Sequence, residues 1–343
     1  MHRCLRYVAR MSEVVTFALF VILLNVADLA GAANPMTQPA INTIVIATNN
    51  WPSQVVGANV IGSVLDRSGF VVVYKISSID YQISALGQGE LHIQTEIRES
   101  VMEEQVEKGI QSGQIVRAGR HQAISKEGWW YPNYVQAACP GLPDWKQLNV
   151  CAEIFQDPST QPLGRFLAGP KSWGYHDQEL VAALKLHFQV VNVESPPVLL
   201  RKLEQAWKKR QPILMFHWSP SWTDIRFPGH FVTFPKFEPN CVTDPSWGPN
   251  PHAIYDCDMH RPGAISKVVW ARFPKKQPCA FKLINRASFT SRDLASMDEM
   301  VTIGKLEPSD AAQKWLAEHE SRWRKWIPDC AKDPHGRKRP DQK

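Results

Sequence analysis

The residues of this chain that could do chemistry are aromatic rings and charged side chains that follow short apolar segments. Trp51 comes after TIVIA, Glu96 and Arg98 come at the end of ELHIQTEIR, and Trp218 ends PILMFHW. Such runs predict strands, and in open α/β sheets ligands bind beyond the carboxyl ends of strands. We therefore expect these four residues to face one crevice, where ring faces and charges of both signs would bind a ligand without covalent chemistry.

Motifs of enzymatic catalysis are missing from the sequence. It contains no GxSxG nucleophile elbow, no HExxH helix and no Walker phosphate loop. The pairs His176 with Asp177 and His252 with Asp256 lack the spacing of a metal site. We expect a protein that is not an enzyme and has no catalytic residues, metal or cofactor. A secreted α/β hydrolase is the less favoured alternative.

Strand and helix patterns alternate in the first part of the chain. In SQVVGANVIGSVLDRSG, Val56, Val60 and Val64 lie near one helical face, Ser53 is a candidate N-cap and Gly69 a candidate end. FVVVYKI then predicts a strand, DYQISALGQG a helix and ELHIQTEI a further strand. This β-α-β-α-β order predicts a parallel sheet with helices on both of its faces.

The same alternation returns later in the chain. DQELVAALKLHF and VLLRKLEQAWKKR predict helices that lead into the strand PILMFHW. Near the end, Pro308 opens a helical pattern that places Trp315, Trp323 and Trp326 on one stripe, where they would anchor the helix on a core. Two α/β units without a low-complexity linker predict two lobes in one rigid body.

The two ends of the chain differ from its middle. Arg3, Arg6 and Arg10 precede the apolar run VVTFALFVILL and then small residues, the pattern of a secretory signal peptide over residues 1–33. An uncleaved N-terminal anchor is the alternative. We expect residues 331–343 to be a disordered basic tail. The formal net charge is +6, but export and the lack of a basic motif argue against a nucleic-acid partner.

Cysteines suggest an oxidising compartment. The chain has 7, and Cys4 lies in the expected signal, so an even number remains for disulfides. The pair we favour is Cys241 with Cys257, because the segment between them is a Pro/Gly-rich loop that a crosslink would tie down.

Several segments together resemble one family. HWSPSW, KSWGYHD, GWWYPNYV and the C-terminal AAQKWLAEH are similar, in order and spacing, to segments of the periplasmic substrate-binding proteins of glycine betaine, proline betaine and choline ABC importers. The resemblance implies an α/β periplasmic-binding-protein fold of type II, with two lobes joined by two crossing hinge segments. Lobe 1 would comprise residues 34–134 and 255–330 and lobe 2 residues 135–254, with crossings near Tyr134 and Tyr255.

The same resemblance implies a function. The protein would be a monomer in the periplasm that binds a quaternary-ammonium compatible solute for osmoprotection and delivers it to an ABC permease and its ATPase at the inner membrane. Trp173 and Trp218 match two tryptophans of the family's aromatic cage. Each ring face attracts such a cation by about 0.5–2 kcal/mol. A ligand-sensing role with a receptor is the alternative that shares this site.

One position departs from the family pattern. Glu96 matches the family's acidic residue, but Arg98 stands where a further cage tryptophan is expected. A guanidinium would repel trimethylammonium and could instead hold a carboxylate. Either Arg98 points away and Trp51, Trp129 or Trp130 completes the cage, or the fold binds a different, anionic solute. Because neighbours in a strand point to opposite faces, at most one of the last two tryptophans can line the crevice.

Overall fold

A computed structural model describes residues 43–332. The expected signal peptide, and the expected tail beyond residue 332, lie outside the described residues. No helix in the described part of the chain is long and apolar enough to cross a membrane.

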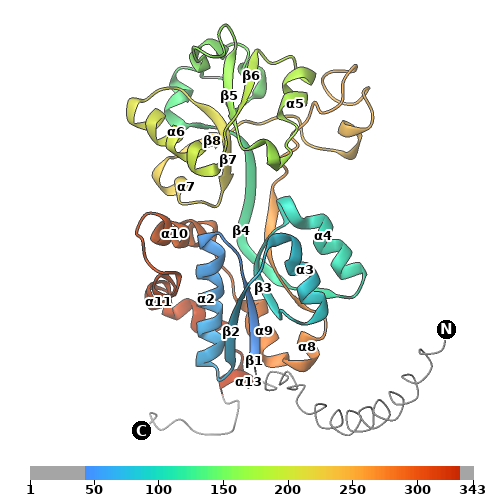
Figure 1. Ribbon diagram of the computed structural model, residues 1–343, viewed down its shortest axis with the longest axis vertical. Coiled ribbons are helices and arrows are strands. Elements are labelled where there is room, and N and C mark those ends of the chain that lie inside the picture. The colour runs from blue at the N-terminus through green and yellow to red at the C-terminus, as the bar shows by residue number, and fades with distance from the viewer. Residues whose placement is uncertain (1–42, 333–343) are drawn as a thin grey trace, which may run out of the picture. The chain divides into compact units, whose positions relative to one another are not determined.

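The first elements alternate as the sequence predicts (Figure 1). β1 pairs with β3 in parallel, with Ile46 opposite Ile93, and β2 lies on the outer side of β1. The elements in chain order are β1 (Thr43–Thr48), α2 (Pro52–Arg67), β2 (Val71–Ile76), α3 (Ile79–Gln88), β3 (Ile93–Arg98) and α4 (Glu99–Gln111).

Helix α2 begins two residues earlier than its sequence suggests. Trp51 is its N-cap residue and Pro52 opens the first turn, where the missing N–H costs nothing. Ser53, the predicted N-cap, lies inside the helix, so that prediction is wrong; its hydroxyl instead donates to Glu96 at 3.2 Å. The predicted apolar face of α2 is buried throughout, and Gly69 follows the helix end with a φ of 90°.

The sheet is mixed rather than parallel throughout. β9 (Gly263–Trp270) lies between β3 and β4 (Ile115–Pro132) and is antiparallel to both. The expectation of a parallel sheet therefore fails in the middle of the sheet, because β9 returns from the far part of the chain and no helix of a βαβ unit precedes it.

Strand β4 is shared by both lobes. It pairs with β9 from Ile115 to Ser125 and with β7 (Leu214–Ser219) from Lys126 to Trp130. Figure 1 shows it running from one group of elements into the other. This change of partner comes before Tyr134, and the chain rejoins the first group in β9, after Tyr255.

The second lobe is a smaller α/β unit. β5 is parallel to both β6 and β7, whereas β4 is antiparallel to β7 and β8. The helix expected over residues 177–188 ends at Ala183, and Phe188 already begins a strand. The elements are β5 (Gly164–Ala168), α5 (Asp177–Ala183), β6 (Phe188–Asn192), α6 (Pro196–Lys209), α7 (Thr223–Arg226) and β8 (Gly229–Phe231).

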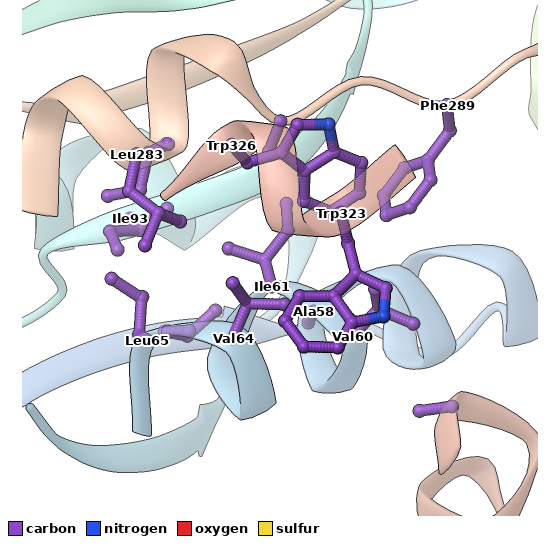
Figure 2. Packing of buried hydrophobic residues seen from close by; sticks show 14 of the residues in the cluster. Ala58, Val60, Ile61, Val64, Leu65, Ile93, Leu283, Phe289, Trp323 and Trp326 are labelled. Atoms are coloured by element: carbon purple, nitrogen blue, oxygen red, sulfur yellow. The ribbon is translucent and has the colours of Figure 1, made fainter. Parts of the chain in front are cut away.

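The C-terminal helices return to the first lobe and cover α2. Trp315, Trp323 and Trp326 are all buried there, as predicted, and Trp326 meets Phe289 edge to face at 5.7 Å. Figure 2 shows the last two of these indoles against Ala58, Ile61 and Val64 of α2. The helices are α8 (Phe273–Lys276), α9 (Pro278–Arg286), α10 (Ser291–Thr302), α11 (Pro308–Glu318), α12 (Glu320–Trp323) and α13 (Asp329–Lys332).

Three disulfides tie down loops and the C-terminal region. The structure joins Cys241 to Cys257, the pair favoured from the sequence, with Cα atoms 6.2 Å apart. It also joins Cys139 to Cys151 and Cys279 to Cys330.

Candidate functional site

The register of β4 and β7 decides which side chains share a face of the second lobe's sheet. Glu127 lies opposite Trp218, and Trp129 lies opposite Phe216. Directly opposed residues in an antiparallel pair project to the same face, and every second residue of a strand returns to that face. These four residues therefore lie on one face.

An aromatic cluster forms on this face, made of Trp173, Tyr175, Phe216 and Trp218. The Trp173 and Trp218 rings meet edge to face, with centroids 6.2 Å apart and planes at 85°. Tyr175 stacks on Phe216 at 4.8 Å. Trp173 and Trp218 are only half-buried, so part of each indole stays accessible. The structure thus brings together the two tryptophans that match the family's cage.

Trp173 owes its place to the loop after β5. It ends a single helical turn, Lys171–Trp173, and Gly174 reverses the chain with a φ of 69°. Gly169 is required for the packing: a Cβ at this position would lie 2.2 Å from the Trp173 ring. The loop begins where β5 ends, which is the location expected for ligand-binding loops in α/β folds.

Trp130 lies on the opposite face of the sheet. It is 2% exposed and stacks on His217 at 4.6 Å. There it lines a separate cavity of about 590 Å³, together with Phe231 and Arg292. Because Trp130 and Trp218 point to opposite faces, Trp130 cannot complete an aromatic wall with Trp218. Trp129 shares the face of Trp218 but is buried in the core.

On the first lobe, Glu96 collects three donors at the end of β3. Its Oε1 accepts from Trp51 Nε1 at 3.0 Å, from Ser53 Oγ at 3.2 Å and from Arg98 Nε at 3.1 Å. Glu96 is 2% exposed, and its Oε2 accepts no hydrogen bond from the described residues. Trp51 and Arg98, which the sequence placed in one crevice with Glu96, thus both bond the Glu96 carboxylate.

A buried amide network holds Glu96 in place. The Glu96 backbone N–H donates to Gln94 Oε1 at 3.0 Å, and Gln94 Nε2 donates to Asn49 Oδ1 at 2.7 Å. Gln54 Nε2 donates to Gln94 Oε1 at 2.9 Å, and its own Oε1 accepts from the Asn49 N–H. Sequence reasoning missed these residues, since polar side chains in predicted strands and helices carry no signal of mutual contact.

Arg98 connects the two lobes. Besides its ion pair with Glu96, its Nη2 donates to the carbonyl oxygen of Pro220 at 3.2 Å. Pro220 follows Trp218 in the chain, so the guanidinium joins the end of β3 to the segment that carries one of the cage tryptophans. A buried ion pair with good hydrogen bonds needs all its partners, because a lone buried charge is costly.

Two further contacts reach the same segment from α10. The Trp222 backbone N–H donates to Asp298 Oδ2 at 3.0 Å, and Arg226 Nε bonds Glu299 Oε1 at 2.5 Å. Burial raises the pKa of the Asp298 carboxyl above its usual range. Trp222 itself is 5% exposed and belongs to the core.

Glu127 is a charged residue of the aromatic face that sequence reasoning missed. Tyr175 donates its hydroxyl hydrogen to Glu127 Oε2 at 2.7 Å. Burial, and then the nearby charge of Glu127, raise the pKa of Tyr175. Tyr175 therefore remains a hydrogen-bond donor over the physiological pH range. The signal that could have found Glu127 is the alignment of GWW with MFHW as paired strands.

Comparison with known proteins places this arrangement in a family. Residues 42–318 match the family model described as the substrate-binding domain of the ABC-type glycine betaine transport system. The chain belongs to this family. Its members are extracytoplasmic solute-binding proteins of ABC transporters. Among the residues that the structure describes, no group of three or more His, Cys, Asp or Glu side chains is placed to hold a metal ion.

Individual relatives agree with the family match. The trimethylamine N-oxide-binding protein of Pelagibacter ubique (strain HTCC1062) is 32% identical over 311 residues, which cover 88% of this chain and 95% of that protein. Lactococcal OpuAC, in its closed conformation with glycine betaine, matches 84% of this chain and 100% of its own, with a TM-score of 0.58 and 17% identity. An ABC-transporter choline-binding protein in complex with choline matches 84% and 93%, with a TM-score of 0.56 and 15% identity. The two structures establish the two-lobed fold.

Proposed function

We propose that this protein binds a small solute with a trimethylammonium head against Trp173 and Trp218 and delivers it to an ABC permease and its ATPase. The observation that carries this proposal is the edge-to-face contact of the two half-buried indoles, with centroids 6.2 Å apart, at the ends of β5 and β7. Because the two ring systems are nearly perpendicular, both can contact the same rounded head group.

The chemistry of the head group favours such walls. A fully methylated ammonium has no N–H and cannot be recognised by hydrogen bonds to nitrogen. Ring faces attract it through their quadrupole, by about 0.5–2 kcal/mol per ring, most where water is excluded. Ring faces offer no hydrogen-bond acceptor to replace the water around an ordinary ammonium, so the two indoles favour the methylated head group.

The other lobe supports a solute that also carries an oxygen anion. Arg98 uses Nε and Nη2 in its contacts with Glu96 and Pro220, and a guanidinium has five N–H donors in total. The N–H groups that remain suit a negatively charged oxygen. Trimethylamine N-oxide is our first candidate, because its oxygen is bonded directly to the methylated nitrogen and a 32% identical relative is named for binding it. Glycine betaine is the second.

A purely anionic solute is disfavoured by the partners of Arg98. Its charge already faces Glu96 at 3.1 Å, so the pair as a whole is near neutral.

Delivery follows from hinge closure: a solute that contacts both lobes stabilises their closed arrangement by its differential affinity. We propose that the protein acts as a monomer in the periplasm. A receptor-linked sensor would use the same site.

Isothermal titration of the purified protein tests the proposal. The panel is trimethylamine N-oxide, glycine betaine, proline betaine, choline, carnitine and two dicarboxylates. We expect micromolar binding of at least one methylated amine, lost in Trp218→Ala and kept in Trp247→Ala. Trp247 is a matched control, because its indole bonds Glu238 rather than a member of the aromatic cluster. Binding of a dicarboxylate alone, lost in Arg98→Ala, would overturn the proposal.

A further inference from the structure

Glu127 lies beside the proposed cation site and has no role in the proposal so far. It is opposite Trp218 in the β4–β7 ladder, and such pairs have Cβ atoms about 4.5–5.5 Å apart on the same face of the sheet. Glu127 is only partly buried. The carboxylate thus stands next to an indole that we assign to the solute's head group.

One oxygen of Glu127 is fixed and the other is open. Oε2 accepts from the Tyr175 hydroxyl at 2.7 Å. Oε1 accepts no hydrogen bond from any residue in the part of the chain that the structure describes. Tyr175 also stacks on Phe216, so its own position is set by the aromatic cluster. The carboxylate is therefore held in a defined orientation against the cluster, with one oxygen left for another contact.

The charge of Glu127 is not neutralised by a neighbouring cation. No Lys, Arg or His in the described part of the chain lies within ion-pair distance of it. The adjacent Lys126 points to the opposite face and packs over the Phe231 ring at 4.8 Å. The other acid of the site, Glu96, shares its charge with Arg98. Of the two carboxylates, Glu127 is the one that still carries an uncompensated negative charge.

We infer that Glu127 is the residue that makes the aromatic site select a positive charge rather than a shape. The rings accept any rounded methylated group, charged or neutral, because most of their contact is dispersion and burial of apolar surface. The carboxylate beside Trp218 adds a Coulomb term that only a cationic head receives. This inference rests on the proposed function and assigns the charge discrimination of the same site to one residue.

Pairs of molecules with the same shape and different charge test this inference. Choline and 3,3-dimethylbutan-1-ol differ only by nitrogen for carbon, and so by one unit of net charge. Trimethylamine N-oxide and tert-butanol are both neutral overall, but only the N-oxide has a positive nitrogen, which its negative oxygen balances. The measurement is the ratio of the two dissociation constants within one pair. The pair used is the one whose member with a positive nitrogen binds the wild-type protein more tightly than the corresponding member of the other pair. The variants are Glu127→Gln, Tyr175→Phe and, as a matched control on an exposed glutamate of the same lobe, Glu153→Gln.

The expected result is a ratio that falls about tenfold in Glu127→Gln, equivalent to about 1.4 kcal/mol, and stays at the wild-type value in Glu153→Gln. The amide of Glu127→Gln can still accept from Tyr175, so folding is preserved while the charge is lost. Tyr175→Phe keeps the charge and should keep most of the ratio, even where both affinities fall.

A wild-type ratio in Glu127→Gln would contradict the inference in either of two ways. If both affinities fall by the same factor, Glu127 only positions Tyr175. If both affinities are unchanged, charge selection lies elsewhere and the proposed function is left intact. If no methylated amine binds the wild-type protein at millimolar concentration, the proposed function itself has failed.

Discussion

Arg98 bonds the carbonyl oxygen of Pro220 at 3.2 Å, although the two residues belong to different lobes. Two more residues of the same segment, Trp222 and Arg226, bond two acids of α10. The segment after Trp218 therefore carries hydrogen bonds that link the two lobes. A solute held by Trp218 would therefore act on the same segment that the first lobe contacts. In the proposed function, binding and lobe closure would thus be coupled through this short segment.

Removing the Arg98 side chain should destabilise the protein as well as weaken binding. In Arg98→Ala, Glu96 remains as a charge that is 2% exposed, and loss of one partner of a buried pair costs about 3–5 kcal/mol. Since Arg98 is itself 15% exposed, we expect the lower end of that range in urea unfolding. Arg98→Met combined with Glu96→Gln should recover most of the loss. Equal destabilisation in the single and the double variant would contradict this account.

The hydrogen bond between Asp298 and Trp222 should affect the affinity for the solute, although neither residue is assigned a contact with it. Asp298→Ala removes the acceptor for the Trp222 N–H, so the closed arrangement is less populated and the apparent dissociation constant rises by the same factor. We expect an increase of about threefold to tenfold by titration, roughly 0.6–1.4 kcal/mol. Thr302→Val is the matched control, because it removes the other hydrogen bond of Asp298 and leaves the Trp222 contact in place. A similar loss in both variants would indicate a local effect on α10.

The parts of the fold that follow local patterns were predictable from the sequence. Alternating strand and helix periods predicted β1 to β3, whereas the proximity of Trp173 and Trp218 was predicted only by the resemblance to the family's aromatic cage. The insertion of β9 between β3 and β4 was not predictable, because strand order depends on contacts between residues far apart in the chain. Glu127 was missed for the same reason: only the pairing of β4 with β7 places it beside Trp218.

Lys267 should make the stability of the protein depend on pH. Its ammonium is buried and donates to the Ala287 carbonyl oxygen at 2.6 Å. Burial lowers its pKa to about 7, from about 10.4 in an unfolded chain. Between these values the folded state binds fewer protons than the unfolded state, so the free energy of unfolding rises with pH, by at most about 1.4 kcal/mol per unit.

The variant Lys267→Met tests whether Lys267 causes this dependence of the free energy of unfolding on pH. Urea unfolding at pH 6, 7, 8 and 9 should show the rise in the wild-type protein, and the rise should be reduced in the variant, which should also be more stable at pH 6. Lys282→Met, on an exposed position of α9, is the matched control and should follow the wild-type curve. Parallel curves for wild type and Lys267→Met would show that this lysine keeps an ordinary pKa.

Gly169→Ala should weaken solute binding through the position of Trp173 alone. The added Cβ would lie 2.2 Å from the indole, so the ring has to move away from its contact with Trp218. We expect at least a tenfold rise in the dissociation constant for the tightest methylated amine, since one cation–π wall is worth about 0.5–2 kcal/mol and the geometry of the second also changes. Gly113→Ala is the comparison: its φ is +70°, and no atom lies within 4 Å of the new Cβ. That variant should lose about 1–2 kcal/mol of stability with unchanged affinity, because a left-handed conformation is costly for alanine. Normal binding by Gly169→Ala would remove Trp173 from the proposed site.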